Sequence, residues 1–179
     1  TLLSVFLYLL VLVSATHQVL EEFNLNRGYL KDANVFLFGS VVSLLKAPTA
    51  LFEELAAMPA NFFINIGLES PDQATLDSLG KPLSTEQVIR AFDLLCLIND
   101  SYPNIEITAN FVIDDALGSN HVESLYHLLC EHPARTRSKG CIYLSPARFG
   151  APSRSRLFDF YHLKTRSRLP LFLYTIHRL

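Results

Sequence analysis

Side chains suited to binding a ligand follow the ends of two apolar, strand-like runs of the sequence. Gly39-Ser40 ends one run, and Gly67-Leu68-Glu69-Ser70 ends the next. A carboxylate such as that of Glu69 accepts hydrogen bonds from ligand hydroxyls, and a glycine just before it lets a ligand or a neighbouring backbone approach closely. Two interpretations of Glu69 stay open: a ligand-binding carboxylate, or a solvated loop residue that pairs with Lys81.

Asn110 is a further candidate because it lies between apolar residues of a strand-like run, Ile105–Ile113. A buried amide must be hydrogen-bonded, so Asn110 either binds a ligand or satisfies nearby backbone groups. Asp114-Asp115 follows directly and could coordinate a cation, but we expect a solvated turn there.

The remaining spacings favour neither a metal site nor a familiar nucleotide or hydrolase motif. The three cysteines lie far apart without a CxxC pair, and each is expected to be a small buried apolar side chain. They are Cys96, Cys130 and Cys141. His121, His127 and His132 are spaced by six and five residues, so they do not share one helix face. The sequence has no P-loop, no GxGxxG and no GxSxG.

Short apolar runs alternate with amphipathic segments along the chain, which predicts βα units and a parallel sheet. Strands are expected at 35–38, 62–68, 105–113, 141–144 and 171–176, and helices at 48–58, 70–79, 84–95, 120–129 and 157–166. Parallel α/β folds bind ligands at the carboxyl ends of their strands. The predicted fold class is therefore α/β, with the candidate residues at one edge of the sheet.

Capping signals indicate where several helices begin. A polar residue followed three positions later by Glu or Gln is typical of a capping box. The expected pairs are Ser70 with Gln73, Ser84 with Gln87, and Asn120 with Glu123. Pro71 fits the first helical position after Ser70, and Gly80 is expected to end that helix.

Composition fits one domain with a sizeable core, since 50% of the 179 residues are hydrophobic and 18% are charged. Such values exclude a disordered or low-complexity chain. The net charge of −2 hides an asymmetry: residues 1–134 carry five Lys/Arg and sixteen Asp/Glu, whereas residues 135–179 carry ten and one. The basic segment either binds nucleic acid or anionic lipid, or packs against the acidic body of its own chain; we favour the second.

The first twenty residues contain no charge, and eleven of the first thirteen are apolar. No basic segment precedes them, as a secretory signal would require, and the apolar run weakens after Val13. Residues 1–20 are therefore either a buried core segment or a membrane anchor. The chain begins with Thr1 rather than Met, so it need not be a complete gene product.

Residues 66–95 resemble the middle of a radical S-adenosylmethionine (radical SAM) enzyme domain. That superfamily has a Gly-aliphatic-Glu/Gln-Ser signature at the end of its fourth strand, then an acidic helix that closes in Leu-x-x-Leu-Gly-Lys, then a helix with Val-x-x-Ala. The matching residues are Gly67, Leu68, Glu69, Ser70, Leu76, Leu79, Gly80, Lys81, Val88 and Ala91. Looser likeness extends to 35–40 and 105–113.

The resemblance implies a binding role for each candidate residue. Glu69, in the Gly67–Ser70 signature, would hold the ribose hydroxyls of S-adenosylmethionine (SAM), and Asn110 would assist. Gly39 and Ser40 would offer backbone carbonyls to the methionyl amine. The intact protein would also hold a [4Fe–4S] cluster and form a 5′-deoxyadenosyl radical that abstracts hydrogen from an unknown substrate; the resemblance names no catalytic residue.

This chain departs from the family because it lacks the cluster-binding CxxxCxxC loop, and the interval from Gly39 to Gly67 is short by one βα unit. We therefore expect an incomplete domain over 1–179, a partial (β/α) barrel, with an apolar lead-in at 1–34, βα units at 35–145 and a basic helix and strand at 146–179. A cytoplasmic location is expected. The alternative is a non-catalytic binding or membrane-associated protein that uses its basic C-terminal segment on RNA or anionic lipid.

Overall fold

The structure is a computed structural model that describes residues 7–8, 33–131, 139–146 and 153–174. Within these ranges six parallel strands form one sheet whose spatial order follows the sequence. The strands are β1 (Leu7–Tyr8), β2 (Ala33–Ser40), β3 (Ala60–Glu69), β4 (Ile105–Ile113), β5 (Ile142–Pro146) and β6 (Leu171–Leu173). The predicted α/β class with a parallel sheet is confirmed.

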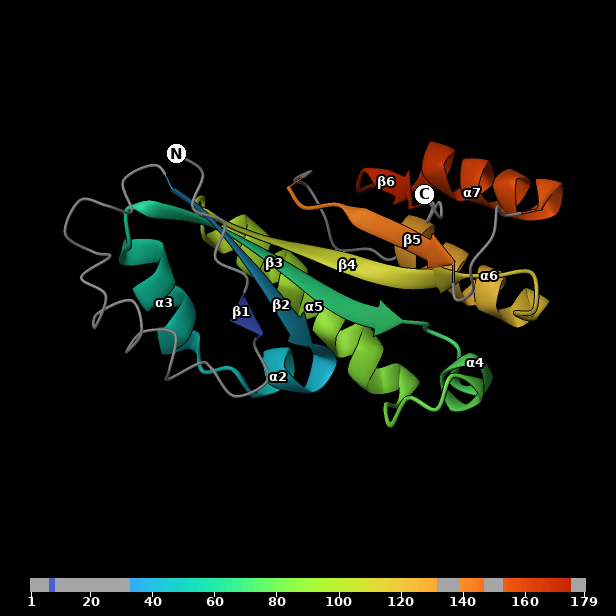
Figure 1. Ribbon diagram of the computed structural model, residues 1–179, viewed down its shortest axis with the longest axis horizontal. Coiled ribbons are helices and arrows are strands. Elements are labelled where there is room, and N and C mark those ends of the chain that lie inside the picture. The colour runs from blue at the N-terminus through green and yellow to red at the C-terminus, as the bar shows by residue number, and fades with distance from the viewer. Residues whose placement is uncertain (1–6, 9–32, 132–138, 147–152, 175–179) are drawn as a thin grey trace.

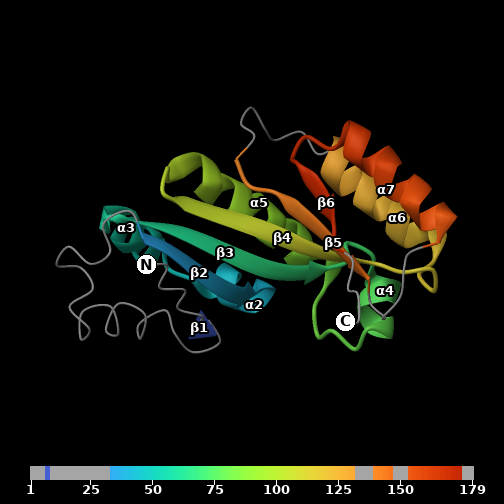
Figure 2. The same ribbon diagram turned by 45° about the horizontal axis from the view of Figure 1, so that its top comes forward.

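Helices connect the successive strands from β2 to β6. They are α2 (Val41–Lys46), α3 (Thr49–Ala57), α4 (Gln73–Ser78), α5 (Thr85–Ser101), α6 (Ser119–Tyr126), its π-helical continuation η1 (His127–Glu131), and α7 (Arg154–Arg166). Helix α5 lies behind β3 and β4 in Figure 1, and α6 and α7 lie side by side in Figure 2. Sequence analysis missed α2, which begins directly after β2.

One face of the sheet forms the core. Along β3, Phe62, Ile64, Ile66 and Leu68 are each at most 4% exposed, while the residues between them are partly exposed. This period of two puts alternate side chains on opposite faces. The buried row packs in one cluster with apolar side chains of α2, α3, α5, α6 and α7. Each fully buried side chain of this size contributes about 1.5–3 kcal/mol to stability.

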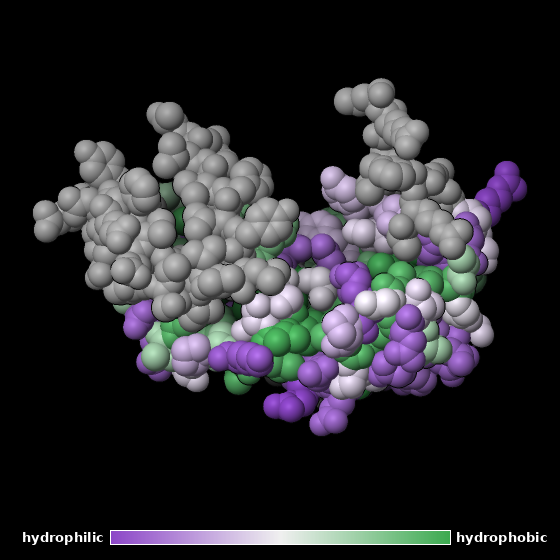
Figure 3. Space-filling model, turned by 60° about the horizontal axis from the view of Figure 1, so that its bottom comes forward, coloured by the Kyte–Doolittle hydropathy of each residue, from purple (hydrophilic) through white to green (hydrophobic). Residues whose placement is uncertain are grey.

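The opposite surface, here called the open face, carries the polar and aromatic side chains. It includes Phe36, Phe63, Asn65, Glu106, Thr108, Asn110 and Tyr143. Because parallel crossovers are right-handed, a sheet wound in one direction places its connecting helices on one side, and the core cluster agrees with that arrangement. Figure 3 shows another side of the molecule, where hydrophobic and hydrophilic residues are interspersed.

The helix starts test the capping predictions. Ser84 and Gln87 form the predicted capping box of α5. The prediction for Ser70 is wrong: Asp72 caps α4, its Oδ2 accepting from the Thr75 amide at 2.9 Å. The Ser70 hydroxyl is instead bonded to a histidine of another helix. Asn120 is also not a cap, since Gly118 precedes the first turn of α6.

The expected segment boundaries are mostly close to the observed ones. Strand β4 spans 105–113 as predicted, whereas β2 begins at Ala33, inside the expected lead-in. Of the apolar segment 1–20, only β1 lies within the described residues, so its role as core or anchor lies outside them. None of the described helices is both long and apolar enough to cross a membrane.

Candidate functional site

Strand register brings three of the predicted binding residues into one row at the carboxyl end of the sheet. Ser40 pairs with Gly67, and Gly67 pairs with Asn110 on the next strand. Gly39 pairs with Ile66, one position earlier. Because neighbouring strands lie about 4.8 Å apart, residues that span 70 positions of sequence come within reach of one small ligand.

Glu69 has a left-handed backbone, with φ of 65°, where the pairing of β3 with β4 shifts register. A left-handed conformation costs a non-glycine residue about 1–2 kcal/mol, so the surrounding structure must hold it. The carboxylate folds back over Gly67: a Cβ placed on that glycine would stand 2.9 Å from Glu69 Oε1. A glycine at position 67 therefore makes room for the carboxylate.

Lys81 holds the Glu69 carboxylate in this place. Its Nζ donates to Glu69 Oε1 at 2.9 Å, so the pairing considered from the sequence is present. Gly80, at φ of 63°, ends α4 by a Schellman motif, in which the Lys81 amide donates to Leu76 O and the Gly80 amide to Asp77 O. In the described part of the chain, Glu69 Oε2 has no hydrogen-bond partner and is available to another donor.

Ser70 lies on the helix side and is fully buried. Its Oγ is 2.8 Å from His121 Nδ1, and His121 Nε2 is 2.9 Å from Val112 O. A carbonyl only accepts, so Nε2 carries the proton and Ser70 donates to Nδ1. Burial lowers the pKa of His121. The two side chains tie the Glu69 turn to α6 and to the end of β4.

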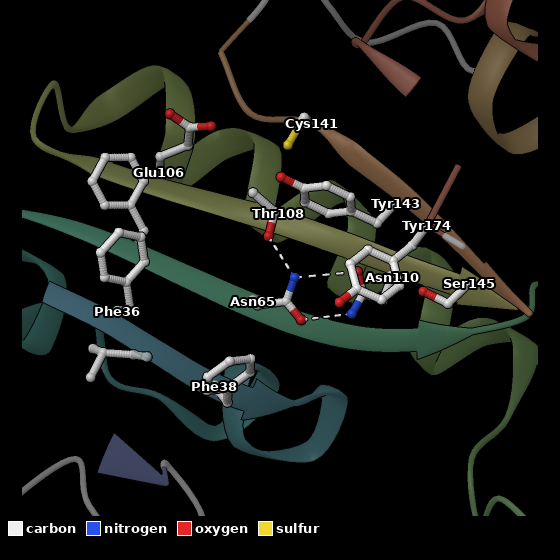
Figure 4. Close-up of a pocket in the computed structure, with 12 residues that line it drawn as sticks. Phe36, Phe38, Asn65, Glu106, Thr108, Asn110, Cys141, Tyr143, Ser145 and Tyr174 are labelled. Atoms are coloured by element: carbon white, nitrogen blue, oxygen red, sulfur yellow. Dashed lines mark hydrogen bonds between the residues drawn. The ribbon is translucent and has the colours of Figure 1, made fainter. Parts of the chain in front are cut away.

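Within the described residues, the side-chain amide of Asn110 bonds to another side chain and not to backbone groups. Its Nδ2 donates to Asn65 Oδ1 at 2.7 Å, and Asn65 Nδ2 donates to Asn110 Oδ1 at 3.3 Å and to Thr108 Oγ1 at 2.8 Å (Figure 4). This amide pair forms a polar floor on the open face. Sequence analysis missed Asn65, and an amide inside the apolar run 62–68 was the available signal.

A cleft of ≈ 580 Å³ lies over the open face, within the size range of small-molecule sites. Asn65, Thr108 and Asn110 line it, and the stacked rings of Phe36 and Phe63, 5.2 Å apart, line its amino-terminal end. Of the predicted binding residues only Asn110 is in the lining. Ser40 and Gly67 belong to the carboxyl-end row, and Gly39 lies one position before it. Glu69 follows the row at the end of β3, and Ser70 belongs to the core.

Tyr143 and Cys141 also line this cleft. The neighbouring Cys141 side chain, followed by burial, raises the pKa of Tyr143 to about 12. Burial raises the pKa of the Cys141 thiol, and the pKa of Cys130 is raised for the same reason. These groups are therefore neutral at pH 7, and neither thiol is activated as a nucleophile.

The described residues contain no group of three or more His, Cys, Asp or Glu side chains that could hold a metal ion. Cys96 is buried on α5, Cys130 lies in η1, and Cys141 directly precedes β5, two residues before Tyr143, the register partner of Asn110. Three thiolates around one cluster face are what a [4Fe–4S] centre needs. The cysteines of the described chain do not fit such a cluster.

Other candidate groups have structural partners. Asp114 accepts from the Ala116 amide at 3.0 Å, which is the turn expected at that position. Arg156 donates to Asp159 Oδ2 at 3.0 Å and to Leu117 O at 2.6 Å, so this member of the basic segment packs against its own chain. Arg135, Arg137, Arg148 and Arg178 of that segment lie outside the described residues.

No family model matches the chain, and no curated protein matches it.

Proposed function

We propose that this chain is part of a radical SAM enzyme domain, a partial (β/α) barrel that binds S-adenosylmethionine at the carboxyl ends of its strands. Two features support the proposal. The consecutive strand order, with helices packed on one face, is the arrangement of a (β/α) barrel segment. The segment that resembles the family, 66–95, forms the end of β3, α4 and most of α5, as the resemblance implies.

The single observation that carries the proposal is the Glu69 carboxylate above Gly67, in a row with Asn110. A carboxylate oxygen accepts from vicinal ribose hydroxyls, and an amide can donate or accept beside it. Glu69 Oε2 would accept from the ribose, while Lys81 holds the carboxylate in place through Oε1. The Asn110 amide retains one N–H beyond its bond to Asn65.

Gly39 and Ser40 would serve through their backbone. The Ser40 hydroxyl already accepts from the Ser43 amide at 3.1 Å as the N-cap of α2. Its side chain is therefore committed to the helix. The Ser40 carbonyl, as that of an N-cap, accepts the first intrahelical bond and keeps its second lone pair for an ammonium group. This division agrees with the role that the resemblance gives to these two residues.

The cluster belongs to the proposal only for a larger protein. Because the described cysteines do not fit a [4Fe–4S] centre, ligands for it are expected outside this sequence, and the function proposed for this chain is SAM binding. The radical hydrogen abstraction implied by the resemblance would need those ligands.

Equilibrium dialysis with radiolabelled SAM tests the proposal. We expect binding by the wild-type chain, competition by adenosine, and no competition by 2′,3′-dideoxyadenosine, which lacks the vicinal hydroxyls. Glu69→Gln removes the charge at constant size and is expected to weaken binding about tenfold, or about 1.4 kcal/mol. Glu53→Gln, at an exposed position on α3, is the matched control. Absence of wild-type binding, or unchanged binding by Glu69→Gln, would overturn the proposal.

A second candidate, binding of a polyanion by the basic C-terminal segment, is favoured by the outer surface of α7. Arg154, Lys164 and Arg166 are exposed there together with Phe158 and Tyr161, which are 71% and 60% exposed. Cationic and aromatic side chains on one helix suit RNA or a membrane surface. Retention on immobilised RNA, or on anionic vesicles, that decreases with salt would favour this alternative.

A further inference from the structure

The amino-terminal half of the cleft on the open face has a chemistry that SAM binding does not use. Phe36 of β2, Phe63 of β3 and Glu106 of β4 are register partners, so they form one row across three strands. The rings of Phe36 and Phe63 stack at 5.2 Å with an interplanar angle of 19°. This row lies four residues before the row of Gly67 and Asn110, or about 13 Å along the strands.

Glu106 is the charged member of this row. It is half-buried and lines the cleft (Figure 4), and no ion pair or hydrogen bond engages its carboxylate in the described part of the chain. Among the described residues, Lys139 interacts electrostatically with Glu106, but its Nζ is held by the backbone carbonyls of Tyr102 and Pro103. Lys139 is not within ion-pair distance of Glu106 and does not line the cleft.

The lining of the cleft excludes an anionic ligand on electrostatic grounds. Among the described residues that line it there is no Lys, Arg or His, and Glu106 alone is charged. A phosphate or carboxylate would be desolvated there without a counter-charge. A cation would find a carboxylate and the faces of aromatic rings, which are the groups that attract ammonium ions.

We infer that the row of Phe36, Phe63 and Glu106 binds a protonated amine carried on an apolar or aromatic body. Glu106 is the counter-ion of the ammonium group, and the stacked phenylalanines contact the body of the ligand. The inference that this row binds a ligand depends on the cleft alone. The further inference that the ligand is the substrate of a SAM-dependent reaction rests on the proposed function, and the polar floor of Asn65 and Asn110 would then lie between the amine and SAM.

Three probes of one shape and different charge test the inference: phenethylamine, 2-phenylethanol and phenylacetate. Their affinities for the full chain can be measured by ligand-observed NMR titration. We expect phenethylamine to bind about tenfold more tightly than the alcohol, because it adds a partly exposed ion pair and a cation–π contact. Phenylacetate is expected to bind most weakly. In Glu106→Gln, which keeps size and shape, the amine should bind no better than the alcohol.

Matched variants separate this site from SAM binding. Glu53→Gln should keep the preference for the amine, and thermal unfolding verifies that each variant is folded. Glu106→Gln should leave SAM affinity unchanged, and Glu69→Gln should leave the amine preference unchanged. Equal affinity for amine and alcohol in the wild type, or a preference that survives Glu106→Gln, would overturn the inference. If the chain prefers the amine but does not bind SAM, the amine site is supported and the proposed function is contradicted.

Discussion

The substitution Gly67→Ala tests the role of the carboxyl-end row in binding separately from the stability of the fold. The added Cβ would stand 2.9 Å from Glu69 Oε1 and 3.7 Å from Glu69 Cδ, and these are its near neighbours. The atom it meets is the end of a flexible side chain, so the carboxylate swings away while the backbone stays. Gly67 is not in the left-handed region, so alanine fits its backbone conformation.

The expected change in stability is small because two effects offset each other. The Lys81–Glu69 ion pair, whose side chains are 42% and 22% exposed, is lost at a cost of at most about 1 kcal/mol. Alanine restricts the unfolded chain and returns about 0.4–1 kcal/mol. The free energy of unfolding should therefore stay within about 1 kcal/mol of the wild-type value.

Binding should respond much more strongly than stability. With Glu69 displaced from the row of Gly67 and Asn110, SAM affinity is expected to fall about tenfold. Urea denaturation and equilibrium dialysis on the same preparations measure the two quantities. Gly118→Ala is the control: a Cβ there meets nothing within 4 Å, and it should cost under about 1 kcal/mol as a poorer cap without changing binding. A free energy of unfolding lowered by more than about 3 kcal/mol, or SAM affinity equal to that of the wild type, would refute this reasoning.

Two further predictions concern stability. Gly140→Ala should lower the free energy of unfolding by about 3 kcal/mol or more in urea denaturation, because φ of 92° strains alanine and its Cβ would stand 2.5 Å from the buried Asn99 Nδ2; a change below about 1 kcal/mol would contradict it. Because the pKa of His121 is lowered in the folded protein, the unfolded chain binds a proton at this residue more readily. The contribution of neutral His121 to stability is therefore present above about pH 6.5 and is lost as the pH falls below that value, by at most about 1.4 kcal/mol per pH unit. His121→Gln should remove this loss of stability between about pH 6.5 and 5.5. The comparison is His127→Gln, because the raised pKa of His127 makes stability change with pH in the opposite direction. If the free energy of unfolding of His121→Gln depended on pH as in the wild type, the assignment would be contradicted.

Much of the fold could be predicted from local sequence. Strand β4 spans 105–113 as its apolar run indicates, and the Ser84–Gln87 box caps α5. These signals depend on residues within about four positions of each other. Helix α2 was missed although Ser40 forms its N-cap, because it is only six residues long and follows β2 directly.

The candidate site was only partly predictable because its contacts cross between strands and helices. Gly39, Ser40, Gly67, Glu69 and Asn110 were found as strand-end residues, and register places three of them in one row. Apart from Lys81, the partner of Glu69, the side-chain partners of those residues could not be predicted from the sequence. The cleft lining on the amino-terminal side likewise comes from register, which aligns three strands side by side.

The sequence by itself determined the α/β class, the order of strands and helices, and which polar residues end the strands. Only the tertiary structure decided their partners: Asn65 meets Asn110 across 45 residues, and Ser70 meets His121 across 51. Ser70 has the local form of a helix cap, yet its hydroxyl serves a histidine on α6. The physical reason is that periodicity and capping are set by near neighbours, whereas a hydrogen bond between strands or helices depends on register and on the direction of each side chain.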